Sequence, residues 1–106
     1  MKRQSLIIVA AAAAGFLIAV PMLATADGRF TRELNIDRSG NDIRVESLPV
    51  GADAAACEAL CTKTAACVAF TYVKQSTTVP QPVCRIKDQA PFGHESNCCV
   101  SGALKK

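Results

Sequence analysis

The chain has few aromatic residues and little net charge. Aromatic side chains make up 5% of its 106 residues, with one Tyr and no Trp, and 12 basic side chains stand against 9 acidic ones. Two of the basic side chains, Lys2 and Arg3, lie at the very start of the chain. Nucleic-acid binding needs a basic surface and, for single strands, aromatic rings on which bases can stack. We therefore expect no nucleic-acid partner.

Histidine is scarcer still, because His94 is the only one in the chain. Nucleophilic catalysis needs a nucleophile beside a base, and acid–base catalysis needs titratable groups held together in a cleft. His94 and Ser101 both lie in a C-terminal segment that offers no such arrangement. We predict that the protein is not an enzyme, that it has no catalytic residues and that it needs no cofactor.

The six cysteines lack the spacings of redox and zinc sites. A thioredoxin-like site has two residues between its cysteines, whereas three and five residues separate Cys57, Cys61 and Cys67. A structural zinc site repeats a close pair of ligands downstream, and only His94 is available to help complete one. We predict no metal site. One alternative stays open, because His94 and the adjacent pair at 98–99 gather soft ligands in a short segment.

The first 26 residues have the features of a secretory signal peptide. Two basic residues precede an apolar run at 6–23, and the Ala-Thr-Ala sequence at 24–26 has the small residues that signal peptidase accepts. We predict cleavage before Asp27 and a periplasmic or extracellular location. The alternative is that the apolar run is kept as an anchor, since its length approaches that of a membrane span. Only in that case do we expect the membrane as a partner.

Residues 27–106 have the length of one small domain with a limited core. Such a domain is expected to draw part of its stability from cross-links, and all six cysteines lie in this part of the chain. In an exported protein, cysteines are expected to form disulfides.

The middle of this segment has the pattern of a helix. Asp53 can cap a run of strong helix formers at 54–63, which ends in Lys63. Cys57 and Cys61 are four residues apart, so they share one face of the helix, with Leu60 beside them. We predict that this face is buried.

Short extended segments surround the predicted helix. Alternation of apolar and polar residues predicts strands at 30–37, 43–48, 67–73 and 83–87. The simplest arrangement is a hairpin of the last two strands crossed by the helix, which makes an α+β fold with one helix packed on an antiparallel sheet. The tail at 88–106 contains proline and glycine and is expected to be mostly irregular.

The polar turn between the first two strands allows two interpretations. Asp37, Asn41 and Asp42 offer oxygen ligands for calcium, but the EF-hand ligand loop with its terminal Glu is absent. We prefer a turn stabilised by Asx hydrogen bonds.

The cysteine spacing suits a helix tied to the segments that follow it. Cys61, near the helix end, can reach Cys67 across a turn, and Cys57 can reach a neighbouring strand at Cys84. The pair at 98–99 has no evident partner. A bond between the two is awkward, since adjacent Cα atoms lie about 3.8 Å apart. Free thiols, a link to another chain and a different pairing are the alternatives.

Three motifs of this chain resemble the PAN/apple family: C-x3-C-x5-C-x-A-F-T-Y at 57–72, Cys-Arg-Ile-Lys at 84–87 and Cys-Val-Ser-Gly at 99–102. The Asp-Arg-Ser-Gly-Asn-Asp sequence at 37–42 is similar to that of small secreted bacterial members. The resemblance covers about residues 30–102 and implies a small disulfide-stapled PAN/apple-like domain.

In that family the helix cysteines pair in a fixed way, which implies disulfides Cys57–Cys84 and Cys61–Cys67 in this chain. Apple domains of the animal type also bond an N-terminal cysteine to a C-terminal one. This chain departs from them, because no cysteine lies at 27–56. The resemblance therefore leaves Cys98 and Cys99 unassigned.

The resemblance implies a secreted or periplasmic, non-catalytic binding module for a protein or carbohydrate ligand. Its ligand-binding residues are unknown, and the loops at 74–82 and 88–97 are the first candidates, because loops on a rigid frame commonly carry recognition. The alternative function is a periplasmic thiol redox or metal-handling protein that uses Cys98 and Cys99. A third is a structural envelope protein anchored by residues 6–24.

Overall fold

The computed structural model describes residues 28–106, so the predicted signal peptide at 1–26 lies outside the described residues. The helix and strands of this part follow one another with short connections. They are β2 (Glu33–Asp37), β3 (Asp42–Ser47), α2 (Ala54–Lys63), β4 (Ala69–Val73), β5 (Val83–Lys87) and β6 (His94–Ala103). Within residues 28–106 no helix has the length and apolar character needed to cross a membrane.

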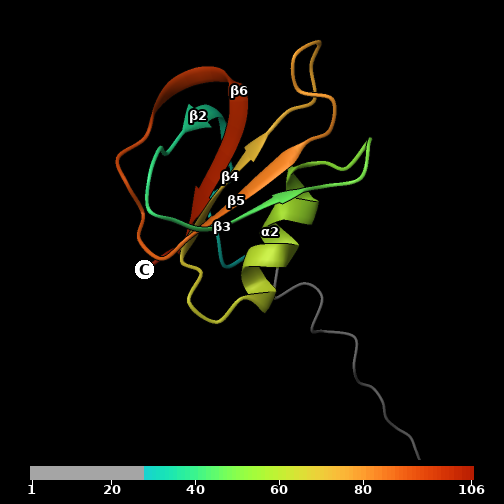
Figure 1. Cartoon of the computed structure of the whole chain (residues 1–106). Coiled ribbons are helices and arrows are strands. Elements are labelled where there is room, and N and C mark those ends of the chain that lie inside the picture. The colour runs from blue at the N-terminus through green and yellow to red at the C-terminus, as the bar shows by residue number, and fades with distance from the viewer. Residues whose placement is uncertain (1–27) are drawn as a thin grey trace, which may run out of the picture.

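The strands form one five-stranded antiparallel sheet in the order β2-β6-β4-β5-β3, and α2 lies against one of its faces (Figure 1). β4 is the central strand and pairs with both β5 and β6, whereas β2 and β3 are the edges. The predicted α+β fold, with a β4–β5 hairpin crossed by the helix, is confirmed.

The helix begins and ends where its sequence predicts. The side chain of Asp53 accepts a hydrogen bond from the Ala56 backbone N–H at 3.2 Å, and Lys63 lies in the last turn, where the helix dipole favours a cation. Cys57 and Cys61 are almost completely buried, at 0% and 1% exposure. The predicted buried face of the helix is therefore the one that meets the sheet.

The core lies between α2 and the sheet. Phe70 on β4 and Ile86 on β5 are completely buried there, and the ring of Phe30 meets the ring of Phe70 edge-on at 5.7 Å. The hydroxyl of Tyr72 reaches past this cluster and donates a hydrogen bond to the Ala52 carbonyl at 2.6 Å. The only Tyr of the chain thus fixes the segment that leads into the helix.

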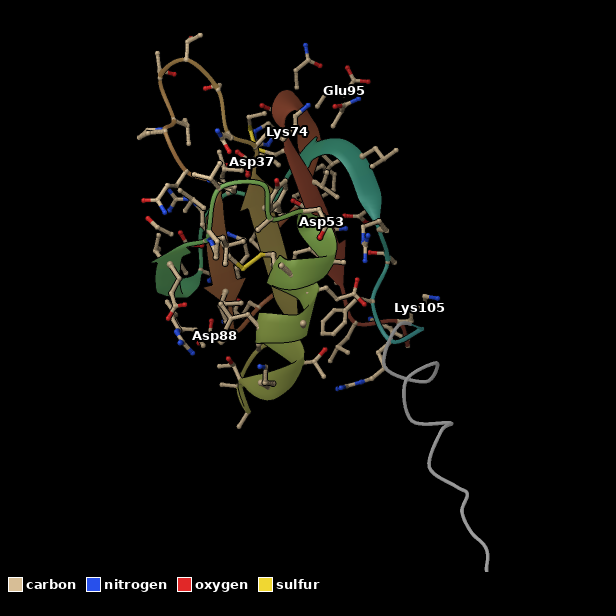
Figure 2. All side chains as sticks on the ribbon, turned by 90° about the vertical axis from the view of Figure 1, so that its right-hand side faces the viewer. Asp37, Asp53, Lys74, Asp88, Glu95 and Lys105 are labelled. Atoms are coloured by element: carbon tan, nitrogen blue, oxygen red, sulfur yellow. A yellow bond between two sulfur atoms is a disulfide. The ribbon has the colours of Figure 1, made fainter. Side chains whose placement is uncertain are left out.

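Two disulfides fasten the helix. Cys57 is bonded to Cys84 on β5, and Cys61 is bonded to Cys67, in the turn that precedes β4. In Figure 2 a sulfur–sulfur bond joins α2 to the strands behind it. These are the pairs that the family resemblance implies.

The prediction of a mostly irregular tail is wrong, because residues His94–Ala103 form β6, the longest strand of the sheet. β6 pairs with β4 along Cys99–Ala103 and with β2 on its other side. Gly102 is required there, since a Cβ atom at this position would overlap the Phe70 ring and the Thr31 carbonyl. Pairing with two strands distant in sequence outweighs the poor strand propensity of this segment.

Candidate functional site

The sheet face opposite α2 is covered by the turn between β2 and β3. The hydroxyl of Ser101 on β6 donates to the Ile36 carbonyl at 2.8 Å and accepts a hydrogen bond from the Arg38 backbone N–H at 3.2 Å. Thr71 on β4 is hydrogen-bonded to the same hydroxyl at 2.8 Å. Thr71 and Ser101 are both completely buried. This layer is therefore polar, in contrast to the apolar layer beneath the helix.

The turn at 37–42 combines a hydrogen bond between two side chains with two left-handed backbone positions, and no Asx hydrogen bond to the backbone is found in this described turn. The Asp37 carboxylate accepts a hydrogen bond from the Ser39 hydroxyl at 2.9 Å, and Gly40 and Asn41 have positive φ angles of 104° and 58°. Glycine and asparagine tolerate this left-handed region better than other residues do. The following Asp42 turns toward two cations, an arrangement that does not favour calcium at its carboxylate.

Asp42, the first residue of β3, forms ion pairs with two cationic side chains of β5. Its carboxylate accepts hydrogen bonds from Lys87 at 2.5 Å and from Arg85 at 2.8 Å. Lys87 has no exposed side-chain surface and also donates to the Gly40 carbonyl at 2.9 Å. Burial alone would raise the pKa of Asp42, but the hydrogen bonds and charges of Lys87 and Arg85 outweigh it, so its pKa is lowered. The turn is thus locked to the sheet by a carboxylate that stays ionised at neutral pH.

A second ion pair, between Arg38 and Glu33, helps to hold the 88–93 loop, which joins β5 to β6, against the same turn. The Arg38 guanidinium donates two hydrogen bonds to the Glu33 carboxylate, at 2.8 and 2.9 Å, and a third to the Pro91 carbonyl at 2.6 Å. The hydrogen bond from Arg38 lowers the pKa of Glu33 and exceeds the opposing effect of burial. Arg38 therefore holds the 88–93 loop against the turn.

An open hollow lies between the turn and β5. It is lined by Asp37, Ser39, Gly40, Asp42 and Arg85 and has a volume of about 210 Å³. Two carboxylates, a hydroxyl, a backbone segment and a guanidinium border it, so its lining both donates and accepts hydrogen bonds. These groups come from a turn that the sheet holds in place, which gives the hollow a fixed shape.

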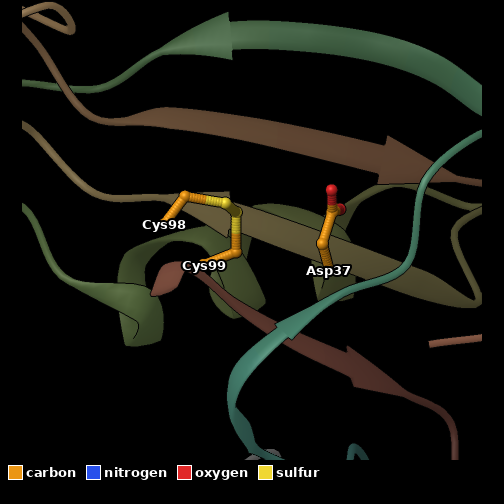
Figure 3. A group of neighbouring side chains, drawn as sticks. All are labelled: Asp37, Cys98 and Cys99. Atoms are coloured by element: carbon orange, nitrogen blue, oxygen red, sulfur yellow. A yellow bond between two sulfur atoms is a disulfide. The ribbon is translucent and has the colours of Figure 1, made fainter. Parts of the chain in front are cut away.

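A third disulfide borders the same turn on its other side. Cys98 and Cys99 are bonded to each other, and their sulfur atoms lie within 4.8 Å of a carboxylate oxygen of Asp37 (Figure 3). The His94 imidazole Nε2 is 4.0 Å from the same carboxylate. Asp37 therefore contributes both to the hollow and to a cluster of sulfur and nitrogen donors.

The two loops selected from the sequence differ in how far they are fixed. The 74–82 loop is mostly exposed between β4 and β5, whereas the 88–97 segment ends inside β6. Sequence reasoning missed the hollow and its residue Arg85. The signal that points to it is the alternation on β5, which places Arg85 and Lys87 on the face opposite Cys84 and Ile86.

A comparison with protein families gives a match for the central part of the chain. Residues 36–87 match the family model described as PAN domain. This segment runs from the end of β2 to the end of β5 and contains both disulfides of the helix. No curated protein and no solved structure shows a significant similarity to the chain. The cysteine motif, the helix-on-sheet fold and this match together identify residues 36–87 as a PAN domain.

Proposed function

We propose that the protein is an exported, non-catalytic binding module that recognises a carbohydrate through the hollow beside the β2–β3 turn. PAN domains in general bind proteins or carbohydrates, so the family supports a binding role. The observation that carries the choice of ligand is the lining of the hollow, which is polar and small. A protein interface would need a far larger surface, of about 800 Å² on each partner.

The chemistry of the lining matches that of a sugar. Each sugar hydroxyl both donates and accepts a hydrogen bond, and neighbouring hydroxyls on a ring can address a carboxylate and a guanidinium together. Asp37 and Asp42 supply the acceptors, and the Arg85 guanidinium, whose side chain is 42% exposed, has N–H groups to spare beyond its bond to Asp42. The hollow offers both partners that a pair of adjacent hydroxyls requires.

The frame around the hollow favours binding because its groups are already in position. The buried Lys87 ammonium donates a hydrogen bond to the Asp42 carboxylate and holds it in place. The Ser101 hydroxyl is hydrogen-bonded to two backbone groups of the turn. Little conformational freedom of the lining is then lost when a ligand binds. The disulfides fasten the helix to one face of the sheet, and the ion pairs fasten the turn to the opposite face. The two sets of contacts use different side chains.

The test of this function is a screen of the purified full-length gene product against an array of glycans, followed by titration calorimetry with the best ligand. We expect Arg85→Gln to weaken binding at least tenfold, while Lys74→Gln, which removes an exposed cation outside the hollow, leaves binding unchanged. Equal effects of the two substitutions, or capture of an envelope protein with no glycan binding, would overturn the carbohydrate assignment.

Export is part of the same proposal, with residues 1–26 as a signal peptide and residues 27–106 as the single mature domain. Non-reducing peptide mapping by mass spectrometry of protein from the cell envelope reports the mature N-terminus and every disulfide together. A mature chain that starts at Asp27 supports the proposal. A chain that still starts at Met1 in membrane fractions would instead support an anchored envelope protein.

A further inference from the structure

A break in the strand pairing brings three potential metal ligands together at the start of β6. β2 and β6 pair at Leu34 with Val100 and at Ile36 with Glu95, so the β6 residues between these points have no regular partners on β2. Such bulges redirect side chains. Here the result is that Asp37, Cys98 and Cys99 place one carboxylate oxygen and two sulfurs within 4.8 Å of one another.

His94 adds a fourth donor from the first residue of the strand. It is the strand partner of Asp37, its Nε2 atom is 4.0 Å from the Asp37 carboxylate, and its side chain is 60% exposed. Two sulfurs, one imidazole nitrogen and one carboxylate oxygen make a donor set that suits zinc in tetrahedral coordination.

The disulfide between Cys98 and Cys99 controls whether this donor set is available, because a metal binds the thiolate form of cysteine. This bond differs from the other two in its place and its geometry. Its Cα atoms are only 3.7 Å apart, against 5.3 Å in each helix disulfide. Disulfides usually join Cα atoms about 4.4–6.8 Å apart, and departures from this range make the bond easier to reduce.

Exposure to solvent also favours reduction of the Cys98–Cys99 disulfide over reduction of the two helix disulfides. Cys98 keeps solvent-accessible surface on β6, whereas all four cysteines of the helix disulfides are 5% exposed or less. An attacking thiolate must reach a sulfur atom to open a disulfide. A dithiol in solution therefore meets the Cys98 sulfur first.

We propose that a dithiol reductant opens the Cys98–Cys99 bond and that the reduced protein binds one zinc ion through Cys98, Cys99 and Asp37, with His94 as the fourth ligand. In the first step the dithiol transfers two electrons and two protons to the Cys98–Cys99 disulfide. The reductant becomes a disulfide, and Cys98 and Cys99 become thiols. In the second step Zn²⁺ displaces the two thiol protons to solvent.

The movement that this change requires is small. With tetrahedral angles and ordinary bond lengths, the oxygen and sulfur ligands of zinc lie roughly 3.5–3.8 Å from one another. The three atoms already lie within 4.8 Å. Separation of the two sulfurs and rotation of these three side chains bring their donor atoms to such distances. The His94 imidazole is near the Asp37 carboxylate but outside this group of three, so it has to turn toward the ion.

The test begins with controlled reduction of the full-length protein. Dithiol is added to the concentration at which alkylation and mass spectrometry find two modified cysteines, at positions 98 and 99, and is then removed under nitrogen. Titration with Co²⁺ reports thiolate ligands by their charge-transfer absorption, and Zn²⁺ is then added in competition. We expect one ion per reduced chain and none per oxidised chain. Simultaneous opening of all three disulfides, or equal uptake by the two forms, would overturn the proposal.

Variants assign the ligands. A chain with both Cys98→Ser and Cys99→Ser is expected to lose the uptake, while circular dichroism shows whether its fold is kept. His94→Gln and Asp37→Asn should each weaken binding about tenfold or more, and Glu95→Gln, which changes an exposed carboxylate beside His94, should not. Unchanged affinity in the Asp37 and His94 variants would show that the ion lies elsewhere.

This site shares Asp37 with the hollow proposed for carbohydrate, but the two proposals can be tested separately. The metal titration contains no sugar, and Arg85→Gln, which alters the hollow, leaves all four donors in place. A protein that binds glycans and takes up no zinc after reduction would therefore disprove the metal site alone.

Discussion

Removal of the Asp42 charge tests whether the turn is locked to the sheet by the buried Lys87. In Asp42→Asn the Lys87 ammonium, with 0% side-chain exposure, would face only neutral acceptors. Breaking a buried ion pair costs about 3–5 kcal/mol. Because the Asp42 side chain keeps 23% exposure, we expect a loss at or slightly below the lower limit of that range, about 2–3 kcal/mol.

The measurement is urea unfolding at neutral pH with the disulfides intact, followed by circular dichroism. Arg85→Gln is the matched control, because it removes the other cation of the same carboxylate from a side chain that is 42% exposed. Exposed ion pairs contribute about 0.2–1 kcal/mol, so this variant should lose less than the Asp42 variant. Similar losses in both would refute the special role of the buried cation.

A second comparison isolates the pair itself. Lys87→Met keeps much of the buried side-chain volume and removes the charge, so adding it to Asp42→Asn removes the unpaired ammonium. We expect the double variant to be more stable than Asp42→Asn alone, which is a strongly non-additive result. Additive losses would mean that the two side chains are not coupled.

Three further predictions concern the rest of the frame. Replacing Cys57 and Cys84 by Ala should cost about 3.5 kcal/mol on loop entropy, from a sequence separation of 27, against about 2 kcal/mol for the other helix disulfide; equal losses in urea unfolding would contradict this. Phe70→Ala should lower the free energy of unfolding by about 3–5 kcal/mol. A thermal unfolding midpoint equal to that of the unchanged protein would show that Phe70 does not fill the core. Because the folded pKa values of Asp42 and Glu33 are lowered, their contribution to stability should be complete above about pH 5 and fall as the pH drops further, whereas constant unfolding midpoints down to about pH 3 would argue against it.

The parts of the fold that were predicted correctly depend on local signals. The α2 helix has a capping residue, a run of helix formers and a cation in its last turn, all within eleven residues of Asp53. In β4 and β5, residues that face the helix alternate with residues that face away from it, and a polar loop joins the two strands. Each of these features acts on the residues that carry it, so the sequence alone is enough to identify them.

β6 was not predicted because its stability comes from partners far away in the chain. Its residues 94–97 are polar, and Gly102 weakens any strand by itself. Yet Gly102 lies against Phe70, and Ser101 reaches across to Ile36. No window of sequence contains both sides of these contacts.

The candidate sites show the same limit. The alternation on β5 places Arg85 and Lys87 on one face, but only the fold reveals that the Asp37–Asp42 turn covers that face and buries Lys87. The bulge between β2 and β6 brings Asp37 to Cys98 and Cys99 from the distant end of the chain. The sequence indicated that the cysteine pair and His94 were unusual and did not indicate the carboxylate that joins them.

The position of β3 at the edge of the sheet has a consequence for solubility. An edge strand offers unpaired backbone groups to any other strand, and on β3 the side chains of Ile43 and Val45 are 45% and 52% exposed. Between and beside them lie Arg44 and Glu46, which form an ion pair with each other on this edge. A second copy that docked its own edge here would have to desolvate these charges, so the pair protects the sheet from strand-to-strand aggregation.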